Sequence, residues 1–390
     1  MRRRTFVGAI GGGATLGFAG CVTRDDENGG NGGNGSDDGS GSDDPADGTD
    51  DSSTDSGEDE LSGTLEVVTY ESMIDGENPA GPWLKDAFED EYPDVELEWT
   101  LLPDGGINHY IQRADQGADI DPDVYLGLNI DDLVTVDDNL ADGGLFQELD
   151  TGAIEHADRI RDGLDMGDPH GRALAYDTGY ISLVYDESEV DAPETFDDLT
   201  EPEYEDALLA QNAQTSDPGQ AFLLWTIDAF GEDGYLDYWG DLEENGVRVL
   251  EDWTESYYGA YMEEERPMVV SYSTDQVFAV AEGNDMTRHQ IAFPNDQGYA
   301  NPEGMAIFDD SESADLAAAF FDFVLSNEPQ AEIAQRNVQF PAVDEEYVDL
   351  DEEFDEYAHV PLEAVTVGYD QLRGNLDGWV DDWAREFASQ

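Results

Sequence analysis

Residues 251–275 combine aromatic rings with carboxylates, a pairing that could bind a flat organic cation. The stretch reads EDWTESYYGAYMEEERPMVVSYSTD, and its aromatic residues are Trp253, Tyr257, Tyr258, Tyr261 and Tyr272. An aromatic face attracts a cation by about 0.5–2 kcal/mol per ring. For Tyr258 and Tyr261, which have helical spacing, core packing is the alternative. We interpret Tyr261 and the Met268–Val270 run as packing, and the glutamates at 263–265 as solvated surface.

Motifs for catalysis are scarce. The histidines are scattered, and none has the His-Glu-x-x-His or another close metal-ligand spacing. No Gly-x-Ser-x-Gly elbow precedes a helix, and the single cysteine lies in an N-terminal targeting pattern. Paired carboxylates could act as acid and base, but among 95 acidic residues any pair is uninformative. We therefore expect no enzymatic activity, no metal site and no cofactor; a secreted hydrolase is the alternative.

The charge balance points to a salt-rich habitat. The 390 residues include 95 Asp and Glu against 15 Lys and Arg, a formal net charge of -80, yet 39% are hydrophobic and can form a core. Near 1 M salt the Debye length falls to about 3 Å, which suppresses the self-repulsion of such a chain. Nucleic acids and anionic membrane surfaces bind basic patches, so this composition argues against both as partners.

The N-terminus carries an export pattern. The sequence MRRRTFVGAIGGGATLGFAGC starts with a twin-arginine-like group and ends in a box that resembles a lipoprotein cleavage site. Its apolar run of about 15 residues is short for a membrane span. We expect a signal peptide over 1–21, lipidation of Cys21, and a body at the extracellular face of the cell membrane. An uncleaved N-terminal anchor is the alternative.

A tether separates this signal from the folded body. Residues 22–63 hold 14 acidic residues and 10 glycines with almost nothing apolar, so burial cannot repay the entropy of folding. For a flexible chain of this length the typical span is about 35 Å. We therefore predict a disordered acidic Gly/Ser/Asp tether over 22–63.

From residue 64 onward, strand-like runs alternate with helical patterns, which predicts an α/β fold with parallel sheets. Buried parallel strands are expected at the last two of the four predicted strands, and Trp225 and Trp239 are expected in the core. Ligands of such sheets bind at the carboxyl ends of strands, where turns occur at 70–72, 103–106 and 127–129; residues 215–219 read as a helix N-cap. The predicted strands are Thr64–Tyr70, Val95–Leu102, Val124–Leu128 and Ile181–Tyr185, and the predicted helices are Gly81 to before Pro93, Gly219–Phe230 and Ala314–Leu325.

The size of the body favours two lobes, because about 327 residues exceed what one core usually organises. An anchor, a tether and a two-lobed α/β body together suggest an external solute receptor. An anchored surface scaffold would have the same leader and tether but no small-molecule cleft.

The body resembles the thiamine-binding receptors of bacterial ABC importers, within the type II periplasmic solute-binding proteins. The matching segments, in collinear order, are VVTYES, LLPDGG, DVYLGL, DTGYISLVYDESEV, TSDPGQAFLLW, WTESYYGAY and VVSYSTD. The resemblance implies an α/β, two-lobed type II periplasmic-binding-protein fold with a hinge and an interlobe ligand cleft. Its segments would be lobe I over 64–176, lobe II over 177–274, and a return to lobe I plus C-terminal helices over 275–390.

The same resemblance implies a function and a set of partners. A haloarchaeal lipoprotein form of this receptor would bind thiamine or its phosphates and deliver the ligand to a membrane permease with a cytoplasmic ATPase. We expect a monomer attached to the membrane through its lipid. A receptor for another small cation, such as a polyamine, or for ferric iron is the alternative.

Ligand-binding residues are also implied by position. The match makes Asp104 and Gly105 a ligand-contacting pair, and Ser216 and Asp217 a pair near the phosphate region. It makes Trp253 a stacking tryptophan and Tyr272–Asp275 the segment that closes the site. Tyr70 and one further tyrosine match two pocket tyrosines. A one-residue insertion leaves the choice between Tyr257 and Tyr258 open. The set is Tyr70, Asp104, Gly105, Ser216, Asp217, Trp253, Tyr257, Tyr258, Tyr272, Ser273, Thr274 and Asp275.

Three departures from the family bear on the ligand. Asp217 replaces a threonine, and its charge should disfavour a phosphorylated ligand. Two family tryptophans fall near Asn78 and Val338, so two walls of an aromatic box differ here. In related ferric receptors a tyrosine pair binds iron at the strand end occupied here by Tyr272 and Ser273, which disfavours iron.

Overall fold

Eleven strands form one mixed sheet in the computed structural model of the chain, which describes residues 61–75, 78–103, 105–140 and 144–387. The strands are β1 (Gly63–Thr69), β2 (Val95–Leu101), β3 (Val124–Leu128), β4 (Ala173–Tyr185), β5 (Leu208–Gln211), β6 (Arg248–Leu250), β7 (Met268–Tyr272), β8 (Gln290–Ala292), β9 (Gln297–Ile307), β10 (Phe340–Pro341) and β11 (Glu363–Val365). The described residues form one compact unit.

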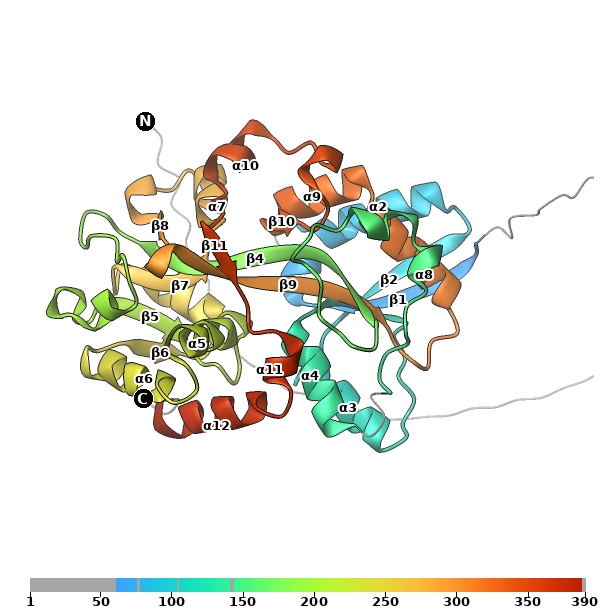
Figure 1. Cartoon of the computed structure of the whole chain (residues 1–390). Coiled ribbons are helices and arrows are strands. Elements are labelled where there is room, and N and C mark those ends of the chain that lie inside the picture. The colour runs from blue at the N-terminus through green and yellow to red at the C-terminus, as the bar shows by residue number, and fades with distance from the viewer. Residues whose placement is uncertain (1–60, 76–77, 104, 141–143, 388–390) are drawn as a thin grey trace, which may run out of the picture. The chain divides into compact units, whose positions relative to one another are not determined.

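Two long strands connect two parallel groups. The order is β2-β1-β3-β9-β4-β7-β5-β6, with β1 parallel to β2 and β3, and β5 parallel to β6 and β7. Between the groups, β4 and β9 run antiparallel to each other over most of their length (Figure 1). Both long strands therefore belong to each half, as expected for a two-lobed type II periplasmic-binding-protein fold with its hinge.

The predicted strands are confirmed in position, but the parallel pairing expected for two of them is not. Val124–Leu128 is β3, which is parallel to β1 but antiparallel to β9. Thr64–Tyr70 and Val95–Leu102 differ from β1 and β2 by one residue at the ends. Ile181–Tyr185 is the last part of β4, which pairs antiparallel with β7, β8 and β9 rather than parallel. A continuous apolar run shows that both faces of a strand are covered, but it does not reveal the direction of its neighbours.

The predicted helices are also present. The helix predicted from Gly81 ends before Pro93, as expected, because Tyr92 leaves the helical region with φ -120° and ψ 78°. Trp225 and Trp239 are fully buried, as predicted. The helices are α1 (Glu71–Ile74), α2 (Ala80–Glu91), α3 (Ile107–Asp115), α4 (Ile130–Asn139), α5 (Asp217–Phe230), α6 (Tyr235–Glu244), α7 (Asp275–Glu282), α8 (Ala314–Val324), α9 (Asn327–Asn337), α10 (Glu352–Tyr357), α11 (Tyr369–Leu372) and α12 (Leu376–Phe387).

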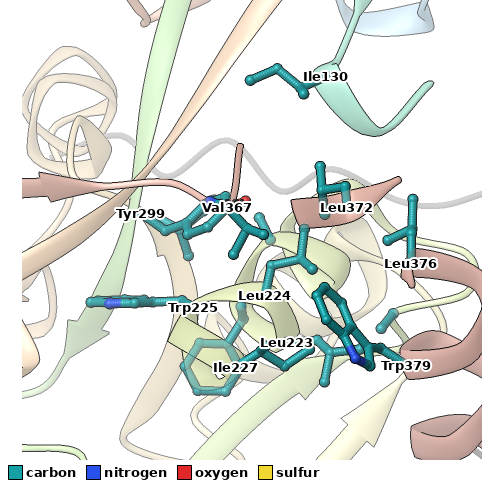
Figure 2. Packing of buried hydrophobic residues seen from close by; sticks show 14 of the residues in the cluster. Ile130, Leu223, Leu224, Trp225, Ile227, Tyr299, Val367, Leu372, Leu376 and Trp379 are labelled. Carbon is teal, nitrogen blue, oxygen red and sulfur yellow. Dashed lines mark hydrogen bonds between the residues drawn. The ribbon is translucent and has the colours of Figure 1, made fainter. Parts of the chain in front are cut away.

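The C-terminal segment packs against the half that contains α5 and α6. Side chains of α5, among them Leu223 and Leu224, share one apolar cluster with Val367 and Trp379 (Figure 2). The ring centroids of Trp239 in α6 and Trp383 in α12 lie 5.2 Å apart in an edge-to-face arrangement. Aromatic contacts of this kind add to simple area burial, so the last helices are part of the core.

A buried ion-pair network fixes the start of β4 to α4 and to the C-terminal segment. Arg172, just before β4, donates to Asp137 of α4 at 2.8 Å and to Asp168 at 2.8 Å, and all three side chains are at most 3% exposed. Tyr369 of α11 also donates to Asp137, and Arg373 pairs with it at 3.3 Å. The network joins segments that are more than 200 residues apart in the sequence.

None of the helices in the described ranges has the length and apolar character needed to cross a membrane. The signal peptide, Cys21 and most of the tether over 22–63 lie outside the described residues. The segment boundaries of the lobes at 64–176, 177–274 and 275–390 stay predictions.

Candidate functional site

A cleft of about 880 Å³ lies where both halves of the sheet contribute strand ends and helix starts. The carboxyl ends of β1 and β7, the start of α5 and the end of α9 all border it. Eight of the predicted site residues line the cleft: Tyr70, Asp217, Trp253, Tyr257, Tyr258, Tyr272, Thr274 and Asp275.

The remaining predicted residues do not line this cleft. Ser273 is fully buried, and Ser216 is 8% exposed at the N-cap position of α5, where its side chain makes no capping hydrogen bond. The helix N-cap predicted within 215–219 is therefore confirmed in position, at Ser216, although the Ser216 side chain does not cap the helix. Gly105 is absent from the lining, and Asp104 lies outside the described residues. Ligand contacts by any member of the predicted set stay predictions.

One wall of the cleft is a stack of aromatic rings. The rings of Trp253 and Tyr257 are nearly parallel at 12°, with centroids 4.7 Å apart, and Tyr258 meets Trp253 edge-on at 5.4 Å. Ser271 Oγ accepts from Trp253 Nε1 at 3.0 Å, which fixes the indole plane. Tyr261 is fully buried, as predicted, whereas Tyr258 is 44% exposed. The wall thus has one stacked pair and, at its solvent side, one exposed tyrosine.

The tyrosines of this wall are carried by a π-helix, Glu255–Tyr261. Its wider turn is seen in the bonds from Met262 N to Tyr257 O at 2.9 Å and from Glu265 N to Ala260 O at 3.0 Å, each five residues apart. π-helical turns are rare and frequent at functional sites. Helical spacing in the sequence predicted a helix here, but it did not predict the π form that places both Tyr257 and Tyr258 at the cleft.

Asp275 presents a carboxylate to the cleft from the start of α7. Its Oδ1 accepts from Tyr257 Oη, and its Oδ2 lies 2.7 Å from Nδ1 of His289, which is 1% exposed. Burial and the Asp275 charge raise the pKa of Tyr257, which keeps the phenol protonated. A carboxylate held on both oxygens cannot rotate away from a ligand.

A second acidic group surrounds the start of α5. Asp217 lines the cleft, and burial raises its pKa. Burial and the charge of Asp217 raise the pKa of neighbouring Asp131 to about 7, although Gln220 donates to that carboxylate. Burial and the charges of Asp131 and Asp217 also raise the pKa of Asp132. A helix N-terminus normally attracts anions, but these carboxylates make this one unfavourable for a phosphate.

The floor of the cleft is a hydrogen-bonded network that sequence reasoning missed. Glu303 Oε2 accepts from Tyr70 Oη at 2.8 Å and from Tyr176 Oη at 2.7 Å. Asn337 Nδ2 donates to Tyr70 Oη at 2.7 Å and to Asp177 Oδ2 at 3.1 Å. The segment DTGYISLVYDESEV was noted for its resemblance, but nothing in it distinguished Asp177 from the other carboxylates.

Gly127 gives Tyr70 its place in this network. A Cβ atom at Gly127 would lie 2.5 Å from the Tyr70 ring, and its φ is +100°. The space beside Gly127 is filled by the Tyr70 ring, and Gly127 itself borders the cleft.

Gly127→Ala should therefore destabilise the fold and displace Tyr70. Overpacking together with a left-handed backbone should cost about 1–3 kcal/mol in the free energy of unfolding, measured by chemical denaturation. Gly144→Ala is the matched control, because no atom lies within 4 Å of a Cβ there and its φ is not positive. Equal unfolding free energies for the two variants would contradict this account of Gly127.

The cleft is strongly acidic overall. Arg336 is the one basic residue among the described lining residues, and it is bonded to Glu332 at 2.6 Å and to Asn78. The lining carboxylates are Glu71, Asp75, Asp217, Asp275, Glu282 and Glu303. Within the described part of the chain no group of three or more His, Cys, Asp or Glu side chains could hold a metal ion. The arrangement suits a cation with aromatic character.

Asn78 and Val338, where the sequence lacks two expected tryptophans, both border the cleft. Val338 ends α9 with φ 53°, in the left-handed region that β-branched residues rarely adopt. Such backbone strain is concentrated at ligand sites. At these two positions an amide and an aliphatic side chain border the cleft in place of two aromatic rings.

Comparison with known proteins places this chain in a family of solute-binding proteins. A family model described as bacterial extracellular solute-binding protein matches residues 121–369. The thiamine-binding periplasmic protein of Salmonella typhimurium is 27% identical over 324 residues, covering 82% of this chain and 92% of that protein. The corresponding protein of Brucella suis is 26% identical, covering 72% of this chain and 79% of its own length.

Solved structures show the same fold. A periplasmic thiamin binding protein superposes with a TM-score of 0.70 at 26% identity, covering 83% of this chain and 96% of that chain. The apo ferric ion-binding protein A of Pasteurella haemolytica reaches 0.66 at 14% identity, with 83% and 97% covered. At that low identity the second likeness concerns the fold alone.

Proposed function

The chain belongs to the family of bacterial extracellular solute-binding proteins, and from this we propose that it is the thiamine receptor of an ABC importer. Members of this family bind and deliver solutes without catalysis, so the chain is a solute-binding protein and not an enzyme. The carrying observation is the stacked pair of Trp253 and Tyr257 in a cleft whose charge is almost entirely negative. A flat aromatic cation satisfies both features.

The charges also indicate which form of thiamine is bound. Asp217 at the start of α5, with Asp131 behind it, opposes a phosphate where a helix N-terminus would otherwise attract one. Free thiamine is therefore the favoured ligand over its phosphates. Binding proceeds by closure of the two halves about β4 and β9, which is the usual motion of two-domain receptors.

The chain's delivery role follows from its leader. We infer export by the twin-arginine route and lipidation at Cys21. A tether over 22–63 then holds the body, as a monomer, at the extracellular face of the cell membrane. The acidic composition is that of a haloarchaeal protein. Mass spectrometry of the mature N-terminus tests the lipid: a lipid-modified Cys21 at the new N-terminus is expected, and an intact residue 1 would contradict cleavage.

Isothermal titration in molar salt tests the ligand. Thiamine should bind with a one-to-one stoichiometry, and thiamine pyrophosphate should bind more weakly because its phosphates meet Asp217. Spermidine and ferric citrate represent the polyamine and iron alternatives. Heat from either of these with none from thiamine would overturn the proposed function at the level of the substrate.

A further inference from the structure

The two hinge strands bring a pair of carboxylates together at the cleft floor, where Glu303 lines the cleft and Asp177 lies beneath it, fully buried and outside the lining. Asp177 of β4 and Glu303 of β9 are directly opposite each other in the antiparallel ladder, next to a bulge at Tyr176. Opposite residues of such a ladder have side chains on the same face, with Cβ atoms about 5 Å apart. Bulges commonly redirect a side chain at a binding site. At this bulge the Tyr176 hydroxyl donates to Glu303.

This carboxylate pair has no partner of opposite charge. Among the described residues, no Lys, Arg or His forms an ion pair with Asp177 or Glu303. Asp177 is fully buried, and its Oδ1 has no hydrogen-bond partner. Buried carboxylates are normally paired or fully hydrogen-bonded.

An independent acceptor points to the same place. Gln339 lines the cleft, is 7% exposed, and its Oε1 also lacks a hydrogen-bond partner. The same Oε1 would lie 2.6 Å from a Cβ at Gly179 of β4, so it lies over the strand that carries Asp177. The floor thus offers carboxylate and amide oxygens but few donors. Tyr70 and Tyr176 already donate to Glu303, and Asn337 already donates to Tyr70 and Asp177.

We propose that Glu303 and Gln339 form an acceptor subsite on the cleft floor, backed by the buried carboxyl of Asp177, which binds an exocyclic amino group of the ligand. The inference rests on the proposed function, because thiamine carries such a group on its pyrimidine ring. Each N–H of an aromatic amino group donates to one acceptor, and the positive charge of the ligand is stabilised by Glu303.

The same subsite releases a proton when it is occupied. Burial and the nearby Glu303 charge raise the pKa of Asp177 well above its usual range, which favours a shared proton on Asp177 when the cleft is empty. Burial also raises the pKa of Glu303, against the two tyrosine hydrogen bonds. When a cationic amino-bearing ring binds to Glu303, its positive charge stabilises the fully ionised pair, and the Asp177 carboxyl gives its proton to solvent. The other titratable groups facing the pair are Tyr70, Tyr176, Asp217 and Tyr272.

Titration of thiamine against oxythiamine tests the subsite, since oxythiamine has an oxo group where thiamine has the amino group. The wild-type protein should bind oxythiamine at least about 10-fold more weakly, because a hydrogen-bonding site rejects an analogue that leaves its groups unpaired. Glu303→Gln should weaken thiamine binding by about 10- to 50-fold. It should also reduce the preference for thiamine over oxythiamine, because the glutamine amide can donate to the oxo group.

Gln339→Leu supplies a second variant that keeps the carboxylate pair unchanged. It should reduce thiamine affinity about 5- to 10-fold by removing one acceptor. Glu328→Gln on the exposed face of α9 is the matched charge control and should bind as the wild type does. Melting curves in molar salt establish that each variant is folded.

The outcomes separate this inference from the proposed function. Wild-type affinity and preference in both Glu303→Gln and Gln339→Leu would overturn the subsite and leave the thiamine receptor intact. An absence of thiamine binding to the wild-type protein would overturn both. Proton release is measured as a binding heat that differs between phosphate and Tris buffers at one pH; Asp177→Asn should remove the difference, and equal heats for the wild-type protein would overturn the release.

Discussion

Replacing Trp253 with alanine should weaken thiamine binding by about 5- to 150-fold. Truncation of a central aromatic side chain in a binding site costs about 1–3 kcal/mol. Trp253 is stacked on Tyr257 and fixed through its Nε1 to Ser271, so its ring is already oriented in the empty cleft. Little ordering entropy then remains to be lost on binding. The dissociation constant from isothermal titration gives the measurement.

A stability control is needed because Trp253 also packs against its neighbours. Trp83→Ala is suitable, since Trp83 is a partly buried tryptophan on α2 that does not line the cleft. It should lower the melting temperature and leave the dissociation constant unchanged. If Trp253→Ala lowered the melting temperature without changing affinity, Trp253 would belong to the core and not to the ligand site.

Arg172→Met should lower the free energy of unfolding by about 3–5 kcal/mol, the largest stability change we expect from a single substitution. Arg172 is the buried partner of Asp137 and Asp168, and removal of one member leaves buried carboxylates unpaired. Asp137 keeps its contacts with Tyr369 and Arg373, so the loss falls mainly on Asp168. Chemical denaturation in molar salt measures the difference.

The same network predicts a pH dependence. Burial by itself raises the pKa of Asp137 and Asp168, but the hydrogen bonds and charge of Arg172 outweigh it and lower both pKa values. A carboxyl group whose pKa is lower in the folded state stabilises the fold above its unfolded pKa of about 3.9. That contribution is lost as the pH falls through the folded pKa.

In Arg172→Met the pKa shift of Asp168, which has lost its partner, changes from downward to upward. Burial without the guanidinium raises the folded pKa, so the variant is penalised at neutral pH and recovers as the pH falls and the carboxyl takes up a proton. The gap in unfolding free energy between wild type and variant should therefore narrow from pH 7 toward pH 4. Arg385→Met, at an exposed pair with Asp382, should leave the melting temperature unchanged. A gap that stays constant over this range would contradict the network's role.

Much of the fold could be predicted because local signals and tertiary packing agree. Val124–Leu128 is apolar on both faces and forms β3, and Pro93 ends the helix before it as backbone geometry requires. The pairing direction of β4 could not be predicted, since it depends on β9, more than 100 residues later. A strand that crosses between two halves has no local mark that distinguishes it from a parallel core strand.

The candidate site divides in a similar way. The aromatic residues between Trp253 and Tyr272 are dense enough in the sequence to be noticed, and they do meet at the cleft. Glu303 and Asn337 were missed because one acidic or amide residue among many carries no signal by itself. Only the hinge topology, which brings β4, β9 and α9 to one floor, sets them apart.

The π-helix that carries Tyr257 and Tyr258 has a consequence for how this receptor can change during evolution. Its hydrogen bonds span one residue more than those of an α-helix, so one residue can be gained or lost within the helix while β6 and β7 keep their positions. Most length changes in proteins accumulate in surface loops, away from packed elements. Here a single codon inserted or deleted would rotate a different ring toward the solute, and ligand preference could shift in one step without any change to the scaffold.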